Sequence, residues 1–99
     1  MSQVGLLVRI EAKPEFAGQV EELLRGALEL ARAEQGTVTW FSFKESATVF
    51  GVFDTFDDED GRAAHIDGRI ADALKEHGPT LFAVAPEIRT TEILAVKLP

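Results

Sequence analysis

The stretch TVTWFSFKESATVFGVFDTF, residues 37–56, decides the fold of this chain. It contains two aromatic and β-branched runs, Thr37–Glu45 and Thr48–Thr55, with only Ser46-Ala47 between them. Residues of these types are enriched in strands, and two such runs with a short polar connection are typical of a β-hairpin. We therefore expect two neighbouring antiparallel strands in the middle of the sequence.

A strand and a helix are predicted before this hairpin. The run VGLLVRIEA, Val4–Ala12, brings in polar residues at alternate positions, which is the period of a strand. Pro14 suits the first position of a helix, and apolar residues then recur at steps of three and four. The sequence predicts that this helix runs to about Gln35 and that Gly36 ends it.

A helical segment and a last strand are predicted after the hairpin. Asp57 is a suitable N-cap, and an acidic cluster follows it at the positive end of the helix dipole. Gly68 is a potential break, and the direction of the His65 side chain depends on whether the helix is interrupted there. Gly78-Pro79 is expected to end the segment. We expect a helical turn at Thr80–Ala85 and a final strand at Glu87–Leu98.

The order βαββαβ predicts an α+β, ferredoxin-like domain that occupies residues 1–99, with an antiparallel sheet and both helices on one of its faces. The other face is expected to carry Leu7, Phe41 and Phe43, together with Ile93 or Leu94 of the last strand, because side chains alternate along a strand. A second copy of the chain is the natural cover for these apolar groups. The expected assembly is a homodimer in the form of a dimeric α/β barrel.

Composition excludes several classes of function. Lys and Arg number 10 against 17 Asp and Glu, a net charge of −7, so nucleic acid is not an expected partner. The chain has no cysteine, and its two histidines lack the close spacing of a metal site. No Gly-rich phosphate loop follows the first strand. No membrane-spanning run or signal peptide is recognisable, so we expect a cytoplasmic protein without a membrane partner.

Two segments resemble the antibiotic biosynthesis monooxygenase family. They are Glu34-Gln35-Gly36 leading into TVTWFSF, and VFDTF followed by DDEDGRAAHI. The resemblance covers essentially the whole chain in element order, although Asp54 stands where the family has Glu, Phe56 where it has Trp, and Gly61 where it has Ala. The positions that correspond to the family motif are Gly36, Trp40, Asp54, Phe56, Gly61 and His65.

The resemblance implies a dimeric α/β barrel and several alternative chemistries. Some members of the family oxidise phenols or quinols without metal or flavin, whereas others degrade haem or isomerise small metabolites. The haem-degrading branch is the least similar, because its three characteristic positions fall here on Leu7, Phe56 and about Leu74. No cofactor is therefore expected.

His65 is the candidate general base, since imidazole titrates near neutral pH and can accept a phenolic proton. Asp54 is the second candidate catalytic residue and would orient a polar group. As a half-buried carboxylate it needs a partner, for which Arg9 and Arg62 are the candidates. His77 is interpreted as a cation at a helix C-terminus. An apolar slot for a flat aromatic substrate is expected from four residues: Trp40, Phe50, Phe56 and Phe82.

The leading hypothesis for function is a monooxygenase that acts without a cofactor on a small phenolic, quinol or polyketide-like aromatic molecule. Two alternatives stay open on the same fold. One is a non-catalytic small-molecule-binding dimer that acts in stress response or ligand sensing. The other is an isomerase of a small carbonyl compound, in which His65 would move the proton and no oxygen would be consumed.

Overall fold

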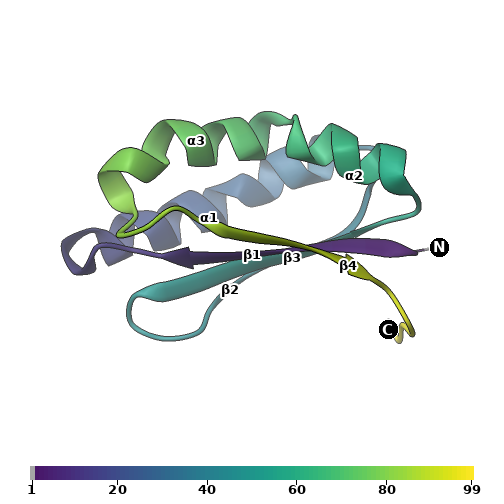
Figure 1. Ribbon diagram of the computed structural model, residues 1–99, viewed down its shortest axis with the longest axis horizontal. Helices are drawn as coiled ribbons and strands as arrows, with labels where there is room; N and C mark the ends of the chain where they lie inside the picture. Colours follow the sequence, from purple (N-terminus) through teal and green to yellow (C-terminus); the bar gives the residue numbers. More distant parts are fainter. Residues whose placement is uncertain (1) are drawn as a thin grey trace.

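The computed structural model describes residues 2–99 and forms a four-stranded antiparallel sheet in the order β2-β3-β1-β4. The helices all cover one face of this sheet, while the other face is open (Figure 1). This arrangement confirms the predicted α+β, ferredoxin-like βαββαβ order. The elements are β1 (Val4–Glu11), the 3-10 helix η1 (Pro14–Phe16), α1 (Ala17–Ala33), β2 (Thr37–Lys44), β3 (Val49–Phe56), α2 (Glu59–Ile66), α3 (Arg69–Leu81) and β4 (Glu87–Glu92).

The core lies between the sheet and the helices, because alternate residues of each strand point toward the helices. Register places Leu6 of β1 and Trp40 of β2 on either side of Asp54 in β3, so the three side chains share the helix-covered face. Asp54 is thus built into an otherwise apolar row. The buried apolar residues of this layer include Leu6, Val8, Ile10, Val20, Leu24, Phe50, Val52 and Phe56.

The expected stop at Gly78-Pro79 is wrong, since α3 continues through both residues to Leu81. Gly78 is buried against the ring of Phe82, and a Cβ at this glycine would lie 2.9 Å from that ring. The backbone N–H of Phe82 donates to the carbonyl of Gly78, which completes the last turn. The expected helical turn at Thr80–Ala85 is also wrong, because Phe82 instead forms a bridge with Ala12 at the end of β1.

The last strand is shorter than expected and ends at Glu92 instead of Leu98. Its partner strand β1 begins at Val4, and the final contact of this edge is a hydrogen bond from Ile93 N to Gln3 O. Beyond this point the chain has no neighbouring strand and bends away from the sheet (Figure 1). The side chain of Leu94 is therefore 94% exposed.

The open face of the sheet carries large apolar side chains, as the alternation predicts. Phe41 is 55% exposed and Phe43 is 44% exposed. The ring of Phe43 lies over Gly51 of β3, where a Cβ would be only 2.2 Å from the ring. Among residues 2–99 both rings keep a large exposed surface, and the homodimer that would cover them stays a prediction.

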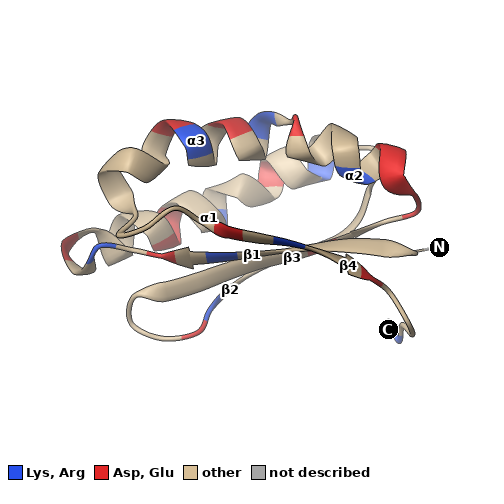
Figure 2. Cartoon of the chain, viewed as in Figure 1, with Lys and Arg blue, Asp and Glu red and all other residues tan. Residues whose placement is uncertain are grey.

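Charged side chains lie mainly on the helices and near the strand ends, and an acidic cluster marks the start of α2 (Figure 2). Among residues 2–99, no helix has the length and apolar character needed to cross a membrane.

Candidate functional site

The break between α2 and α3 allows the side chain of His65 to point toward the interior of the protein. The helix α2 begins after Asp58, whose carboxylate accepts a hydrogen bond from Gly61 N at 2.9 Å; the N-cap is therefore Asp58 and not the expected Asp57. It ends before Asp67, and α3 starts after Gly68. With this interruption the side chain of His65 is only 6% exposed.

His65 meets Asp54 beneath the helix. Its Nε2 lies 2.9 Å from Oδ2 of Asp54, at ion-pair distance but without the alignment of a good hydrogen bond. Asp54 is fully buried, and Phe56, two residues further on the same strand face, places its ring centroid 5.3 Å from that of His65. The predicted catalytic pair is therefore in direct contact.

The prediction that Arg9 or Arg62 pairs with Asp54 is wrong. Arg62 donates to the backbone carbonyls of Gly5 and Thr91 and pairs with Glu59. Arg9 extends along the surface toward Glu45. Both guanidinium groups have partners elsewhere, and the cationic partner of Asp54 is the imidazole of His65.

Glu34 is a member of the site that the sequence interpretation missed. Its Oε1 lies 2.6 Å from Nδ1 of His65 and also accepts a hydrogen bond from Thr37 Oγ1 at 2.8 Å. Glu34 directly follows α1, where it looks like an ordinary polar residue at a helix end. The signal in the sequence was its place two residues before Gly36, in the segment Glu34-Gln35-Gly36 that resembles the family motif.

Two glycines allow Glu34 to reach His65. A Cβ at Gly36 would lie 3.0 Å from the Cα of Gly61, so the turn after α1 touches the first turn of α2 backbone to backbone. Gly68 lies against the same carboxylate, since its Cβ would be 3.0 Å from Oε2 of Glu34. Side chains at these positions would force the segments apart and lengthen the contact between Glu34 and His65.

The two carboxylates control the protonation of His65. Burial alone disfavours the imidazolium and lowers its pKa, but the contacts with Asp54 and Glu34 and their negative charges outweigh burial. The net result is a pKa raised above the ordinary value of 6.5. When His65 is protonated, both ring nitrogens carry a proton and each faces a carboxylate oxygen, Nδ1 that of Glu34 and Nε2 that of Asp54.

Two buried polar atoms beside this cluster have neither a hydrogen-bond nor an ion-pair partner among residues 2–99. They are Oδ1 of Asp54 and Nε1 of Trp40, whereas Oδ2 of Asp54 has only its ion-pair contact with His65. Because Trp40 and Asp54 are opposite each other in the β2–β3 register, one acceptor and one donor are left unpaired on neighbouring strands. A buried polar atom without a hydrogen bond lowers the stability of the fold. The row of Trp40 and Asp54 is therefore a polar spot within an otherwise apolar layer.

A cavity of 160 Å³ adjoins His65 and lies between the α2–α3 helices and strands β1, β3 and β4. We call it the His65 cavity. Apart from His65 and Lys75 its lining is entirely apolar, and a dry cavity of about 150 Å³ is large enough to hold benzene. The lining residues are Leu6, Val8, Val52, His65, Ile66, Ile70, Ala71, Leu74, Lys75, Pro86 and Ile88.

The four predicted slot residues do not gather around this cavity. Phe56 contacts His65, and Trp40 is beside Asp54, but both are packed in the layer behind the cavity. Phe50 lines a separate hollow near Lys44, and Phe82 lines another at the end of α3. The structure thus brings His65, Asp54, Phe56 and Trp40 together and leaves Phe50 and Phe82 apart from them.

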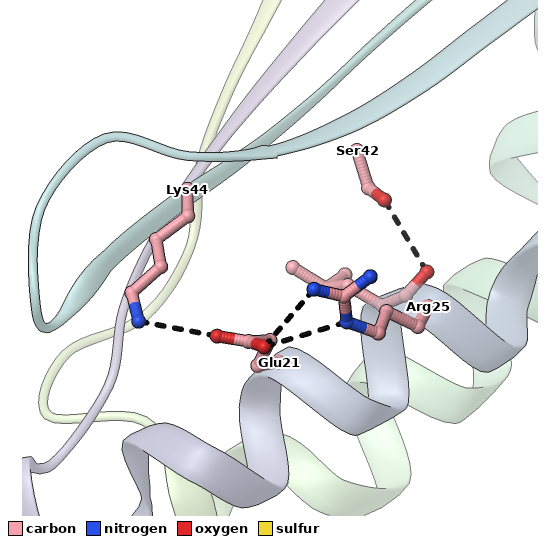
Figure 3. Close-up of polar contacts among 5 residues, drawn as sticks. Glu21, Arg25, Ser42 and Lys44 are labelled. Carbon is pink, nitrogen blue, oxygen red and sulfur yellow. Dashed lines mark hydrogen bonds and ion pairs between the residues drawn. The ribbon is translucent and has the colours of Figure 1, made fainter.

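The hollow near Phe50 is bordered by a surface ion cluster (Figure 3). Glu21 accepts from Lys44 at 3.1 Å and from Arg25 at 3.2 Å, and these bonds, that of Lys44 first, lower the pKa of Glu21. Ser42 donates to the carbonyl of Leu24. These groups bind one another and tie α1 to β2, so this cluster is structural. No group of His, Asp and Glu residues suited to a metal ion occurs within residues 2–99.

The fold and the site define a small α+β protein with a buried carboxylate–imidazole–carboxylate cluster beside an apolar cavity. Two candidate antibiotic biosynthesis monooxygenases share this fold. The protein from Nitrosomonas europaea is 15% identical with a TM-score of 0.83, over 93% of this chain and 99% of that one. The protein from Caulobacter crescentus is 19% identical with a TM-score of 0.79, over 95% of this chain and 92% of that one.

A second Nitrosomonas europaea protein is far more similar. The chain is 47% identical to NE2512, a protein of unknown function, with a TM-score of 0.97 over 100% of this chain and 96% of that one. The chain belongs to the same family as NE2512. No protein-family model and no curated protein matches it.

Proposed function

We propose that this protein is a monooxygenase that oxidises a small phenolic or quinol-type aromatic without metal or flavin. The observation that carries the proposal is His65, held between Asp54 and Glu34 at the wall of an apolar cavity. The shared fold of the candidate monooxygenases supports the same activity. The cavity volume of 160 Å³ favours a substrate with a single ring.

His65 is the proton acceptor in this proposal. The neutral ring is the form that accepts: Nδ1–H donates to Glu34, and Nε2 carries no proton. The raised pKa means that this ring binds a proton more firmly than free imidazole does, which favours a phenolate next to an imidazolium. Nε2 is the accepting atom, because its contact with Asp54 is the less aligned of the two. Glu34 keeps the ring oriented through Nδ1, and Asp54 stabilises the cation that forms.

The bound phenolate then reacts with dioxygen. It passes one electron to dioxygen, and the resulting superoxide and phenoxyl radical combine at a ring carbon that carries hydrogen. The peroxide takes up the proton held by His65, and loss of water across the C–H and O–O bonds leaves a quinone. One oxygen atom enters the product and the other leaves as water. The protein contributes a dry cavity, a proton acceptor and fixed proximity.

Oxygen uptake tests the proposal directly. Purified, metal-free protein is mixed with a panel of single-ring phenols and quinols, and oxygen consumption is measured together with quinone absorbance. We expect turnover that falls at least 100-fold in His65→Ala, in line with the usual contribution of a general base. His77→Ala is the matched control and should keep the wild-type rate. Absence of turnover above background across the panel would refute the proposed activity.

A non-catalytic ligand-binding role is the second candidate. It is favoured by the fact that both ring nitrogens of His65 already face a carboxylate oxygen, so the imidazole has partners without a substrate. Trp40 packs against the small cluster of Ala27, Ala31 and Ile70, of which Ile70 lines the His65 cavity, and its fluorescence should report ligand binding. Saturable binding without ligand consumption would favour this role over catalysis. Conversion of a carbonyl compound in the absence of oxygen would instead favour the isomerase.

We also propose that the protein works as a homodimer whose open sheet faces meet. The exposed rings of Phe41 and Phe43 support this arrangement, since large apolar patches of monomers are commonly interaction sites.

A further inference from the structure

The His65 cavity has two polar lining residues at different places along its length. His65 precedes the break between the helices, whereas Lys75 lies in the second half of α3. Ile70 and Lys75 are five positions apart on one helix, which is roughly 7 Å along its axis. Ile70, Leu74 and Lys75 thus line the cavity along successive parts of α3, with Lys75 the polar residue among them.

The two ends of the cavity differ in charge. His65 in its cationic form, together with Asp54 and Glu34, carries a net negative charge, so the His65 end repels a carboxylate. Lys75 has no ion pair or hydrogen bond among residues 2–99. An anionic group in the cavity would therefore be stabilised at the Lys75 end.

We infer that the ligand of the His65 cavity is a single-ring aromatic carboxylate with a hydroxyl group, such as a hydroxybenzoate. The carboxylate pairs with Lys75 at the mouth, the ring contacts Ile70 and Leu74, and the hydroxyl group faces His65. This inference rests on the proposed function and adds the substrate class. Lys75 acts in it as a specificity-determining residue, without a part in the proton transfer.

Calorimetric titration under nitrogen tests the inference, because binding is then separated from oxidation. The probes are 4-hydroxybenzoate and its methyl ester, which has the same ring and hydroxyl group but no charge. Wild type should bind the acid about fivefold more tightly than the ester, the usual upper contribution of an exposed ion pair. Lys75→Gln should lose this preference. Arg69→Gln, which removes an equal charge from an exposed position of the same helix outside the cavity, should keep it.

Each result has one meaning. Equal affinity of wild type for acid and ester, no binding of either, or an unchanged preference in Lys75→Gln overturns the inference. Binding of the acid through Lys75 with no oxygen uptake supports the inference and refutes the proposed oxygenation. Oxygen uptake with 4-hydroxybenzoate at the same rate and the same KM in wild type and Lys75→Gln supports the oxygenation and overturns the inference.

Discussion

Glu34 and His65, 31 positions apart in the sequence, are joined by a contact of 2.6 Å between Oε1 and Nδ1. This contact connects the end of α1 to α2 and occupies the ring nitrogen that Asp54 does not reach. His65 is therefore held from both sides, and its orientation depends on a residue outside its own helix.

Removing the charge of Glu34 should lower the pKa of His65. In Glu34→Gln the imidazolium loses one of two neighbouring anions while its burial is unchanged, so the neutral ring is favoured. The glutamine oxygen can still accept from Nδ1, so a charge-assisted hydrogen bond becomes a neutral one, and the free energy of unfolding should fall by about 1 kcal/mol.

NMR titration of the His65 ring and urea unfolding measure the two effects. Glu29→Gln is the matched control, because Glu29 is an exposed residue of α1 that pairs only with Arg32 on its own helix. It should change stability by less than about 0.5 kcal/mol. The same His65 pKa in Glu34→Gln and wild type would contradict the assigned role of Glu34.

Stability should fall as the pH is raised above 6.5. The folded protein binds the His65 proton more tightly than the unfolded chain does, since the pKa is raised from 6.5. This contribution is fully present below pH 6.5 and is lost as the pH passes through the higher folded pKa. Urea midpoints measured from pH 6 upward should show the decline. His77→Gln should keep it and His65→Gln should not; an identical slope in His65→Gln would show that other groups cause it.

Gly36→Ala should destabilise the protein by about 1–3 kcal/mol, the usual cost of inserting a methyl group into a packed contact. The new Cβ would lie 3.0 Å from the Cα of Gly61, a backbone atom that cannot move aside independently. Because the two segments must separate, the His65 pKa should also fall toward its ordinary value.

Gly26→Ala is the opposite case and serves as the control. Gly26 is exposed within α1, and a Cβ there meets nothing within 4 Å. Alanine should raise stability by about 0.5–1 kcal/mol through helix propensity. Thermal unfolding of the two variants gives the comparison. If both changes stabilise the protein, the glycine contact is not a tight one.

Charging the open sheet face should dissociate the proposed homodimer. Phe41→Asp places a carboxylate at a 55% exposed position of the face, where burial of the ring would otherwise contribute about 1.5–3 kcal/mol per subunit. Sedimentation of wild type at micromolar concentration should show a dimer, and Phe41→Asp should be a monomer. Val84→Asp, at a 58% exposed apolar position on the chain between α3 and β4, should stay dimeric. A monomeric wild type would overturn this assembly.

Two predicted boundaries near the C-terminus were wrong: the end of the helix at Gly78-Pro79 and the end of the last strand at Leu98. Gly78-Pro79 is a strong local stop signal, but the Phe82 ring packs on Gly78 and the helix continues to Leu81. The alternation through Leu98 is typical of a strand, yet a strand needs a partner, and β1 offers none beyond Val4. Local propensity could not reveal either long-range condition.

The sequence by itself determined the order of elements and the helix-covered face that Asp54 shares with Phe56, because periodicity and alternation are local properties of the chain. It also identified His65 and Asp54, through the resemblance of short segments. Only the tertiary structure decided that these two residues touch, that neither Arg9 nor Arg62 is the partner of Asp54, and that Glu34 completes the cluster. The physical reason is that the helix break at Gly68 and the contact between Gly36 and Gly61 set distances between segments far apart in sequence, and such distances depend on packing in three dimensions.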